Sequence, residues 1–329
     1  MLRTLVARSD SFALATPFRI SRGVKTVADV VTVEISAGGV TGRGEGVPYP
    51  RYGESIDGAL AAIAAARSAV EAGASRADVL TLMLAGAARN AVDCALWDLE
   101  AKLDGRSVTD MLGQSPIGTT PTAMTVSLDT PDAMATAARA LAGVPLVKIK
   151  VDRSDPEAQI RRVREVAPAP RVIVDPNESW TIAEVERLQD MLVELRVDLL
   201  EQPLPAEADD ALAGFRSRIP IAADESAHVA GDVAALAEKY QVVNIKLDKT
   251  GGLTAALKLA DAAAAAGLGV MTGSMISTSL SIAPALVVAA RSSFVDLDGP
   301  LWLAADRPGG VIGVGGVLTP PAPGFWGGL

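Results

Sequence analysis

The chain has 329 residues, of which 49% are hydrophobic and 21% are charged, and its formal net charge is −9. This length exceeds the usual size of a single hydrophobic core and favours a main domain with a second domain attached. The acidic balance and the lack of a basic run argue against nucleic acid as a partner.

The N-terminal part predicts an antiparallel sheet followed by helices. Residues 1–18 are interrupted by charges and lack the apolar core of a signal peptide. A strand is predicted at 30–35, and a Gly-Gly turn leads to the returning strand at 40–45. Ala-rich and Leu-striped patterns then predict helices at 57–72 and 88–103. We expect residues 1–115 to form an α+β capping domain.

From about residue 121 the chain alternates strand-like and helical segments. Short apolar, β-branched runs predict eight strands, at 121–126, 146–151, 171–175, 197–201, 219–224, 242–247, 269–272 and 294–296. Eight parallel strands with helical crossovers close into a barrel, so the expected class is α/β with a TIM-type barrel over 116–308. The Gly- and Pro-rich segment 309–329 is expected to be irregular and to pack back on the capping domain.

No segment of the chain predicts a membrane span. The Ala-rich stretch 255–270 is too short for one and carries two charged residues. Cys94 is the only cysteine, which excludes an intrachain disulfide and fits a reducing compartment. We therefore expect a cytoplasmic protein with no membrane partner.

Six ionisable residues lie at nearly even intervals at or near the C-terminal ends of the predicted strands. They are Lys148, Lys150, Asp175, Glu201, Asp224 and Lys246. Side chains alternate between the two faces of a strand, so both lysines of 146–151 share the face opposite the apolar residues. The same count puts the three acids and Lys246 on the inner face. We expect all six at the barrel mouth, where barrel enzymes place their active sites.

The three acids predict a site for a divalent metal. Converging carboxylates repel one another unless they are protonated or neutralised. His228 is the only histidine, which gives poor support to a multi-histidine zinc site. Oxygen ligands alone select Mg²⁺, with Mn²⁺ as a substitute, and leave positions open for substrate oxygens. Any one acid alone could be a helix cap or a loop acid, but three in phase favour the metal site.

The lysines suit proton transfer next to a carboxylate. A buried lysine near a dication has a lowered pKa and can act as a neutral base near pH 7. A metal on the substrate carboxylate would stabilise the charge that builds up when the α-proton leaves. Lys150 and Lys246 lie on the second and sixth strands, so they could act on opposite faces, as racemisation or epimerisation requires. The alternative, lysines that merely extend to solvent, is weaker beside these acids.

Five motifs at these positions resemble, in order and spacing, those of the enolase superfamily, muconate-lactonising subgroup. They are Lys148-Ile149-Lys150, Asp175-Pro176-Asn177-Glu178, Glu201-Gln202-Pro203, Asp224-Glu225-Ser226 and Asn244-Ile245-Lys246. The resemblance covers nearly the whole chain and implies a modified (β/α)7β barrel with a capping domain. It also implies Mg²⁺ on the three acids, acid–base roles for Lys150 and Lys246, and an electrostatic role for Lys148. We place Asn177 and Glu225 next to the metal ligands as supporting residues.

The segment Asp296-Leu297-Asp298, after the eighth strand, resembles the pair with which dipeptide epimerases hold the substrate ammonium group. Two acids at i and i+2 share a face and can cradle one amine, whereas an ordinary turn is the alternative. The segments 48–55, 246–252 and 273–275 are similar to those of L-Ala-D/L-Glu epimerases of murein peptide recycling. This resemblance implies a capping loop at 48–55 that closes over a dipeptide.

For the substrate itself, Ser274 and Met275 are further candidate binding residues. Arg22 is the candidate for the side-chain carboxylate of a glutamate, with Lys25 and Arg51 as competitors and a solvated cation as the alternative. We also expect a homo-oligomer. Other functions stay open: another dipeptide specificity, a muconate cycloisomerase or o-succinylbenzoate synthase reaction, a barrel that only binds ligand, or a Schiff-base aldolase.

Overall fold

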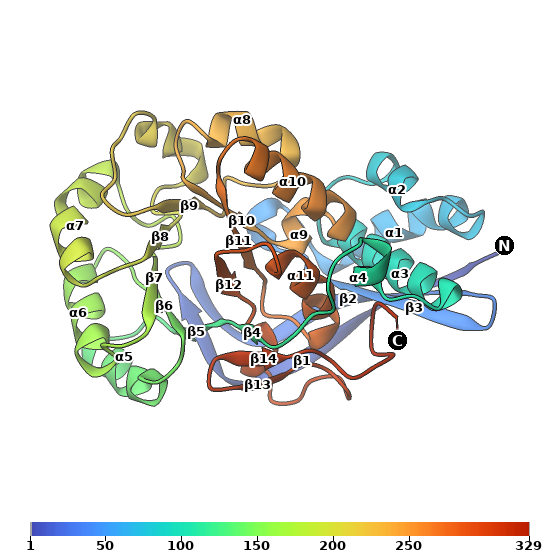
Figure 1. Cartoon of the computed structure of the whole chain (residues 1–329), viewed down its shortest axis with the longest axis horizontal. Helices are drawn as coiled ribbons and strands as arrows, with labels where there is room; N and C mark the ends of the chain where they lie inside the picture. The colour runs from blue at the N-terminus through green and yellow to red at the C-terminus, as the bar shows by residue number, and fades with distance from the viewer. Residues whose placement is uncertain (1, 329) are drawn as a thin grey trace.

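A computed structural model describes residues 2–328 of the chain. Its N-terminal part is a three-stranded antiparallel sheet in the order β1-β2-β3, with β1 at Thr4–Ile20, β2 at Gly23–Ala37 and β3 at Val40–Gly46. The strand β1 was not predicted, and β2 begins well before the predicted residue 30. The two long strands form a hairpin that runs from the capping domain along the barrel (Figure 1).

Helices cover one face of this sheet and confirm the two predicted ones almost to the residue. They are α1 (Ile56–Glu71), α2 (Arg76–Leu82), α3 (Ala87–Asp104) and α4 (Val108–Met111), with the short 3₁₀ helix η1 (Pro50–Tyr52) before them. The Ser55 side chain caps α1 by accepting from the Gly58 amide, and Gly105 ends α3 in the left-handed region.

Glycines at alternate positions of β3 let α3 lie directly on the sheet. A Cβ atom on Gly44 would lie 2.1 Å from the backbone oxygen of Ala91, and Gly42 and Gly46 are similarly close to the helix. No side chain fits in that space, so the close approach requires glycine. The sheet and α3 therefore pack backbone against backbone.

The predicted barrel is confirmed as a sheet of eight parallel strands in chain order. The strands are β5 (Ala123–Val126), β6 (Leu146–Lys150), β7 (Arg171–Asp175), β8 (Leu199–Glu201), β9 (Ile221–Ala223), β10 (Val242–Ile245), β11 (Gly269–Gly273) and β12 (Phe294–Asp296). Five are shorter than predicted. β10, for instance, ends before Lys246 because the chain there turns into a helix, with the Lys246 carbonyl accepting from the Thr250 amide.

Side chains close the seam between the first and last strands of the barrel. The Leu297 amide donates to Thr122 Oγ1 at 2.8 Å, and the Thr125 amide donates to Asp298 Oδ2 at 2.9 Å. These bonds join the end of β12 to β5, where the sheet has no backbone ladder.

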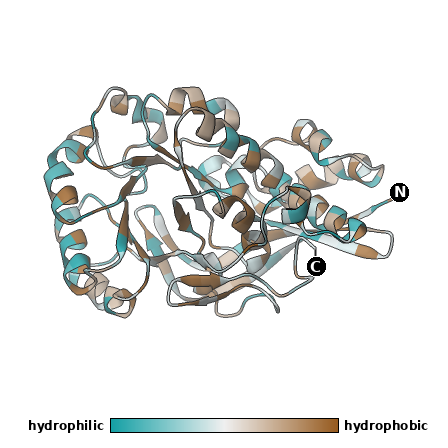
Figure 2. Cartoon of the chain, viewed as in Figure 1, coloured by the Kyte–Doolittle hydropathy of each residue, from teal (hydrophilic) through white to brown (hydrophobic). Residues whose placement is uncertain are grey.

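Helices surround the barrel, and the outermost carry much of the hydrophilic surface while the central strands are largely hydrophobic (Figure 2). The α-helices are α5 (Pro131–Ala138), α6 (Pro156–Val166), α7 (Ile182–Glu194), α8 (Val233–Leu236), α9 (Leu247–Thr250), α10 (Leu253–Ala265) and α11 (Ser279–Ala289). The 3₁₀ helices are η2 (Arg139–Leu141), η3 (Ala206–Leu212), η4 (Ala230–Asp232) and η5 (Gly299–Trp302). No helix within residues 2–328 has the length and apolar character that a bilayer crossing requires.

The barrel interior confirms the predicted alternation of side chains. Each strand contributes one buried apolar residue to a single inner cluster: Ala123, Leu146, Ile173, Leu199, Ala222, Val242, Met271 and Phe294. Val147 and Ile149 belong instead to the cluster between strands and helices. Two positions after an inner apolar residue come Lys148, Asp175 and Glu201, so these ionisable side chains lie one layer above the apolar floor.

The C-terminal segment is more regular than predicted. It forms β13 (Ile312–Val314) and β14 (Val317–Thr319), which pair with β4 (Thr120–Pro121) in a second small sheet. Two glycines with positive φ make the tight turn between β13 and β14, which explains why Gly-rich sequence gives a hairpin here. Beyond it, the Trp326 indole donates to the Cys94 carbonyl of α3 at 3.1 Å.

Candidate active site

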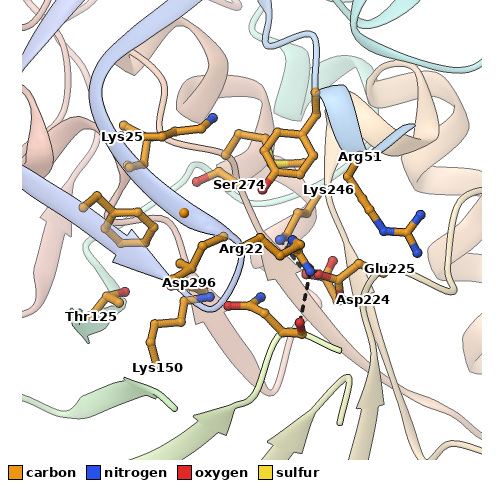
Figure 3. Close-up of a pocket in the computed structure, with 18 of the residues that line it drawn as sticks. Arg22, Lys25, Arg51, Thr125, Lys150, Asp224, Glu225, Lys246, Ser274 and Asp296 are labelled. Carbon is orange, nitrogen blue, oxygen red and sulfur yellow. Dashed lines mark hydrogen bonds and ion pairs between the residues drawn. The ribbon is translucent and has the colours of Figure 1, made fainter. Parts of the chain in front are cut away.

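A cavity of about 520 Å³ opens at the C-terminal ends of the barrel strands, between the barrel and the capping domain (Figure 3). From the barrel it is lined by the predicted residues Lys148, Lys150, Asn177, Asp224, Glu225, Lys246, Ser274, Met275, Asp296 and Asp298. From the capping domain it is lined by Arg22, Lys25 and Arg51. Asp175 and Glu201 lie beneath it and are 0% exposed.

Lys148 joins three acids from three strands at the base of the cavity. Its Nζ atom lies 3.0 Å from Asp175 Oδ2, 2.8 Å from Glu201 Oε2 and 2.8 Å from Asp296 Oδ2. The side chain is almost completely buried, so its charge acts on these carboxylates with little screening by water. The resemblance implies an electrostatic role for Lys148, which stays a prediction.

Lys150 and Lys246 enter the cavity from β6 and from the end of β10, with three strands between them in the sheet. Lys150 Nζ donates to Asp175 Oδ2 at 2.5 Å, and Lys246 Nζ donates to Asp224 Oδ2 at 2.7 Å. Figure 3 shows the two side chains reaching into the same space from different sides. The space between them is where a proton could be exchanged on two faces of one carbon atom.

Lys249 belongs to this charge network, although the sequence analysis gave it no role. Its Nζ atom donates to Asp224 Oδ1 at 2.6 Å and also to the backbone oxygen atoms of Asp224 and Asn244. The residue lies on α9, the single turn that follows Lys246. A lysine in a buried turn closed by two glycines was the available signal, because such a lysine needs a buried acceptor.

The charges of the protein shift the pKa values of the acids in opposite directions. Burial raises the pKa of Asp175 and of Asp224, but the neighbouring lysines outweigh it and hold both below the usual range. Burial and the charge of Asp175 raise the pKa of Glu201 to about 8. Glu201 is therefore the acid of the three whose negative charge is least offset by the neighbouring lysines.

Lys148 and Lys246 differ from the expectation of a lowered pKa. Burial is the largest single influence on Lys246 and lowers its pKa, but Asp224 and the other nearby acids together outweigh burial and raise it. Asp296, Glu201 and the other acids of the network together do the same for Lys148. The expectation assumed a dication that cancels the negative charge, whereas the protein groups alone stabilise the ammonium form. Burial does lower the pKa of Lys249.

The donor set fits a hard divalent cation. Within residues 2–328 no three Asp, Glu, His or Cys side chains are grouped tightly enough to hold a metal, because lysine amines lie between the acids. Glu201 Oε2 is buried, and its ion pair with Lys148 Nζ at 2.8 Å does not have hydrogen-bond geometry. Three buried carboxylates at the ends of neighbouring strands match the ligand chemistry of a hard divalent cation.

Two asparagine residues orient the predicted metal ligands. The Asn177 backbone amide donates to Asp175 Oδ1 at 2.8 Å, which agrees with a supporting position for Asn177. Asn244 Nδ2 donates to Glu201 Oε1 at 2.9 Å. Glu225 directly follows Asp224 in the chain, and its carboxylate accepts from Arg22 at 2.7 Å.

Asp296 and Asp298 both face the cavity, as their spacing predicted. Asp296 accepts from Lys148, whereas Asp298 accepts from the Thr125 amide and, at 3.2 Å, from the Trp302 indole. Burial and the charge of Asp296 raise the pKa of Asp298 to about 6. The pair forms an acidic end of the cavity next to Lys148.

The three cations from the capping domain differ in how they are bound. Arg22 donates to Glu178 at 3.0 Å and to Glu225 at 2.7 Å, and Arg51 donates to Glu178 at 2.8 and 2.7 Å. Lys25 forms no ion pair with any of the residues 2–328, and its Nζ atom lies 4.8 Å from the centre of the Tyr49 ring. Lys25 thus offers the cavity a cation without a carboxylate partner.

Comparison with known proteins agrees with this geometry. Residues 132–325 match the enolase C-terminal domain-like family, and residues 2–113 match the mandelate racemase / muconate lactonizing enzyme N-terminal domain. The chain therefore belongs to the enolase superfamily, as its motifs suggested.

Within this superfamily the chain is similar to dipeptide epimerases. It is 45% identical over 307 residues to an L-Ala-D/L-Glu epimerase of Escherichia coli K12, covering 93% of this chain and 96% of that protein. An N-acetyl-D-glutamate racemase of a Pseudoalteromonas species is 42% identical over 290 residues, with 87% and 91% covered. These relatives are isomerases that act on amino acid derivatives.

Two solved structures of similar proteins contain ligands. An enolase family member from Agrobacterium tumefaciens with bound sodium and L-Ala-L-Glu is 49% identical, with a TM-score of 0.96 and 99% and 100% of the chains covered. A dipeptide epimerase from Methylococcus capsulatus with Mg and L-Arg-D-Lys is 32% identical, with a TM-score of 0.90 and 99% of each chain covered. Both likenesses extend over the whole fold, cap and barrel together.

Proposed function

We propose that the protein epimerises dipeptides at the Cα atom of their C-terminal residue, with L-Ala-D/L-Glu as the preferred substrate, in murein peptide recycling. The observation that carries this proposal is the placement of Lys150 and Lys246, which reach one cavity from β6 and from the end of β10. A 1,1-proton transfer needs two proton-transfer groups on opposite faces of one carbon atom. The expected homo-oligomer and cytoplasmic location stay predictions.

Asp175, Glu201 and Asp224 would hold a divalent cation, Mg²⁺ or its substitute Mn²⁺. When bound, the cation supplies positive charge to the substrate carboxylate, which makes the adjacent α-proton more acidic. Asn177 and Asn244 fix the orientation of two of these ligands through the hydrogen bonds described above.

The two lysines exchange roles with the direction of the reaction. One lysine must be neutral to take the α-proton, and the other must be an ammonium group to deliver a proton to the opposite face. Lys148, held among Asp175, Glu201 and Asp296, keeps a positive charge at the base of the cavity. That charge favours the form in which negative charge has moved onto the substrate carboxylate.

The acidic pair Asp296 and Asp298 would bind the free ammonium group of the dipeptide. Both acids are buried, and an ammonium group placed between them would form charge-assisted hydrogen bonds with little solvent screening. Ser274 and Met275 line the same cavity and would contact the peptide. An N-acylated amino acid has no ammonium group and could not use this pair.

We assign the side-chain carboxylate of the substrate glutamate to Lys25 instead of Arg22. Arg22 already donates to Glu178, to Glu225 and to the Asn177 carbonyl, whereas Lys25 has no carboxylate partner within residues 2–328. A cation that lines the cavity without a partner is the better receptor for a further carboxylate. Arg22 then serves to hold the loop that carries Lys25.

Incubation of L-Ala-L-Glu with the protein and Mg²⁺ in D₂O tests the proposal. Deuterium is expected at the glutamate Cα together with formation of L-Ala-D-Glu, both visible by proton NMR. N-acetyl-L-glutamate is the comparison substrate, because it keeps both carboxylates and lacks the amine. Absence of exchange across a panel of dipeptides, or faster exchange of N-acetyl-L-glutamate, would contradict the assignment.

A further inference from the structure

One barrel residue, Glu178, contacts both of the capping segments that face the cavity. The first segment is the tip of the β1–β2 hairpin, which carries Arg22 and Lys25. The second is η1, which carries Arg51. Glu178 lies in the loop after β7, three residues beyond Asp175, so the contact joins the cap to the loop of a predicted metal ligand.

The contacts to Glu178 use both of its carboxylate oxygen atoms. Arg51 Nε donates to Oε2 at 2.8 Å and Arg51 Nη2 to Oε1 at 2.7 Å, which is a two-point pair. Arg22 Nη1 donates to Oε2 at 3.0 Å, and the Ala206 amide donates to Oε1 at 2.9 Å. The side chain of Glu178 is 8% exposed, so these pairs are far less screened than pairs on an open surface.

The backbone around Glu178 holds its carboxylate in place. Asn177 and Glu178 have φ values of 46° and 66°, a left-handed conformation that is unfavourable for residues with a side chain. The Glu178 amide donates to the Gln202 carbonyl of the next βα loop at 2.9 Å. The hairpin tip also reaches this loop directly, since Ser21 Oγ donates to the Asn177 carbonyl at 3.2 Å. This loop is therefore a fixed anchor that both capping segments contact.

We propose that Glu178 is a positioning residue, a shared latch that holds both capping segments closed over the cavity. Within residues 2–328, Glu178 is the only carboxylate that pairs with both arginines. Each arginine also has one partner that the other lacks: Arg22 pairs with Glu225, and Arg51 pairs with Glu207, whose side chain is 69% exposed. Loss of the Glu178 charge therefore loosens both segments at once, and with them Lys25 and the tyrosine side chains of residues 49 and 52.

The variant Glu178→Gln tests the latch, because it removes the charge and keeps the size of the side chain. Hydrogen exchange followed by mass spectrometry is expected to accelerate in peptides that cover residues 18–27 and 48–54, with the exchange of the barrel strands unchanged. This part does not depend on the proposed function. The part that does is kinetic: KM for L-Ala-L-Glu rises about tenfold, with kcat within about threefold of the parent.

Glu207→Gln is the matched control, because it removes the other acid that pairs with Arg51 and lies outside the cavity. It is expected to leave exchange in both segments, KM and kcat as in the parent. Unchanged exchange in Glu178→Gln overturns the latch, and so does acceleration in only one of the two segments. If the parent protein fails to epimerise any dipeptide but Glu178→Gln still loosens both segments, the proposed function fails and the latch stands.

Discussion

The barrel mouth and the capping segments both place charged residues in one cavity, but they hold them in different ways. In the barrel, Lys148, Asp175 and Glu201 lie on strands in a fixed register, one layer above an apolar floor. In the cap, Arg22 and Arg51 come from a hairpin tip and a single 3₁₀ turn, and their positions depend on ion pairs with the barrel. The difference separates a rigid chemical centre from an adjustable recognition surface.

This division predicts which changes affect chemistry and which affect substrate choice. Strand register cannot shift by one residue without reversing every side chain, so the centre tolerates little variation. Loop contacts can change one at a time, which suits residues that select among substrates. Changes in the barrel should therefore lower kcat, and changes in the cap should mainly raise KM.

The largest effect is expected for Lys150→Met and Lys246→Met. Each removes one proton-transfer group, and kcat for epimerisation should fall by about 10³-fold or more, since general acid–base groups contribute this much. Epimer formation measured by NMR checks the change. Lys258→Met, at an exposed lysine of α10, is the control and should match the parent. If either variant kept a tenth of the activity, the lysine would not be a proton-transfer group.

The next effect is expected for Asp224→Asn in metal binding and stability. The change leaves Lys246 and Lys249 buried without their carboxylate partner, which should lower the free energy of unfolding by about 3 kcal/mol. Calorimetry should show loss of Mg²⁺ binding, and urea unfolding should show the loss of stability. Asp210→Asn, at an exposed acid that pairs with Lys239, should change neither. Normal Mg²⁺ affinity in Asp224→Asn would remove this residue from the metal site.

A smaller effect, confined to recognition, is expected for Lys25→Met. The catalytic efficiency for L-Ala-L-Glu should fall about tenfold to a hundredfold through KM, because one charge-assisted pair to the substrate is lost. Efficiency for L-Ala-L-Leu, which has no side-chain carboxylate, should not fall. Equal losses on both dipeptides would show that Lys25 stabilises the tip of the β1–β2 hairpin and does not bind the glutamate side chain.

The smallest effect is expected at Asp248, where barrel and cap meet. Its carboxylate accepts from the Val47 amide at 2.9 Å and from Asn90 at 2.8 Å, and burial raises its pKa to about 7. A raised pKa means that the folded state prefers the protonated acid, so this contribution to stability is present below about pH 4 and lost as pH rises through about 7.

Asp248→Asn should remove this dependence. The thermal midpoint of the parent should fall relative to that of the variant between about pH 4 and 7, by a few degrees at most. Thermal unfolding of both proteins across this range measures the difference. Parallel pH profiles of the two proteins would show that Asp248 does not affect stability through a change of protonation in this range.

The barrel could be predicted from the sequence because its signals are local. Alternation within each strand gave the inward direction of Lys148 and Lys150, and the inner apolar cluster agrees with it. The strand ends were less accurate, because the chain leaves the sheet where a residue such as Lys246 starts a helix. The C-terminal hairpin was missed because its Gly-Gly turn looks like irregular sequence until its partner β4 is known.

The cap contacts could not be predicted in the same way. Arg22 and its partner Glu225 are 203 positions apart, and nothing in the neighbouring sequence of either residue indicates the pair. The strand β1 was missed because exposed residues occupy much of both its faces, so its hydrophobic alternation is weak. Long-range ion pairs and edge strands depend on the assembled fold.

Asp298 has both a structural role and a proposed role in binding substrate. Its carboxylate closes the barrel seam through the Thr125 amide, and it also faces the cavity beside Asp296. A relative that evolved to use substrates without an amine would be expected to keep this acid. Without it, the first and last strands of the barrel would lose one of the hydrogen bonds that join them. The structural role of Asp298 thus limits which substitutions this position can accept. New substrate specificities should arise more readily through changes in the β1–β2 hairpin.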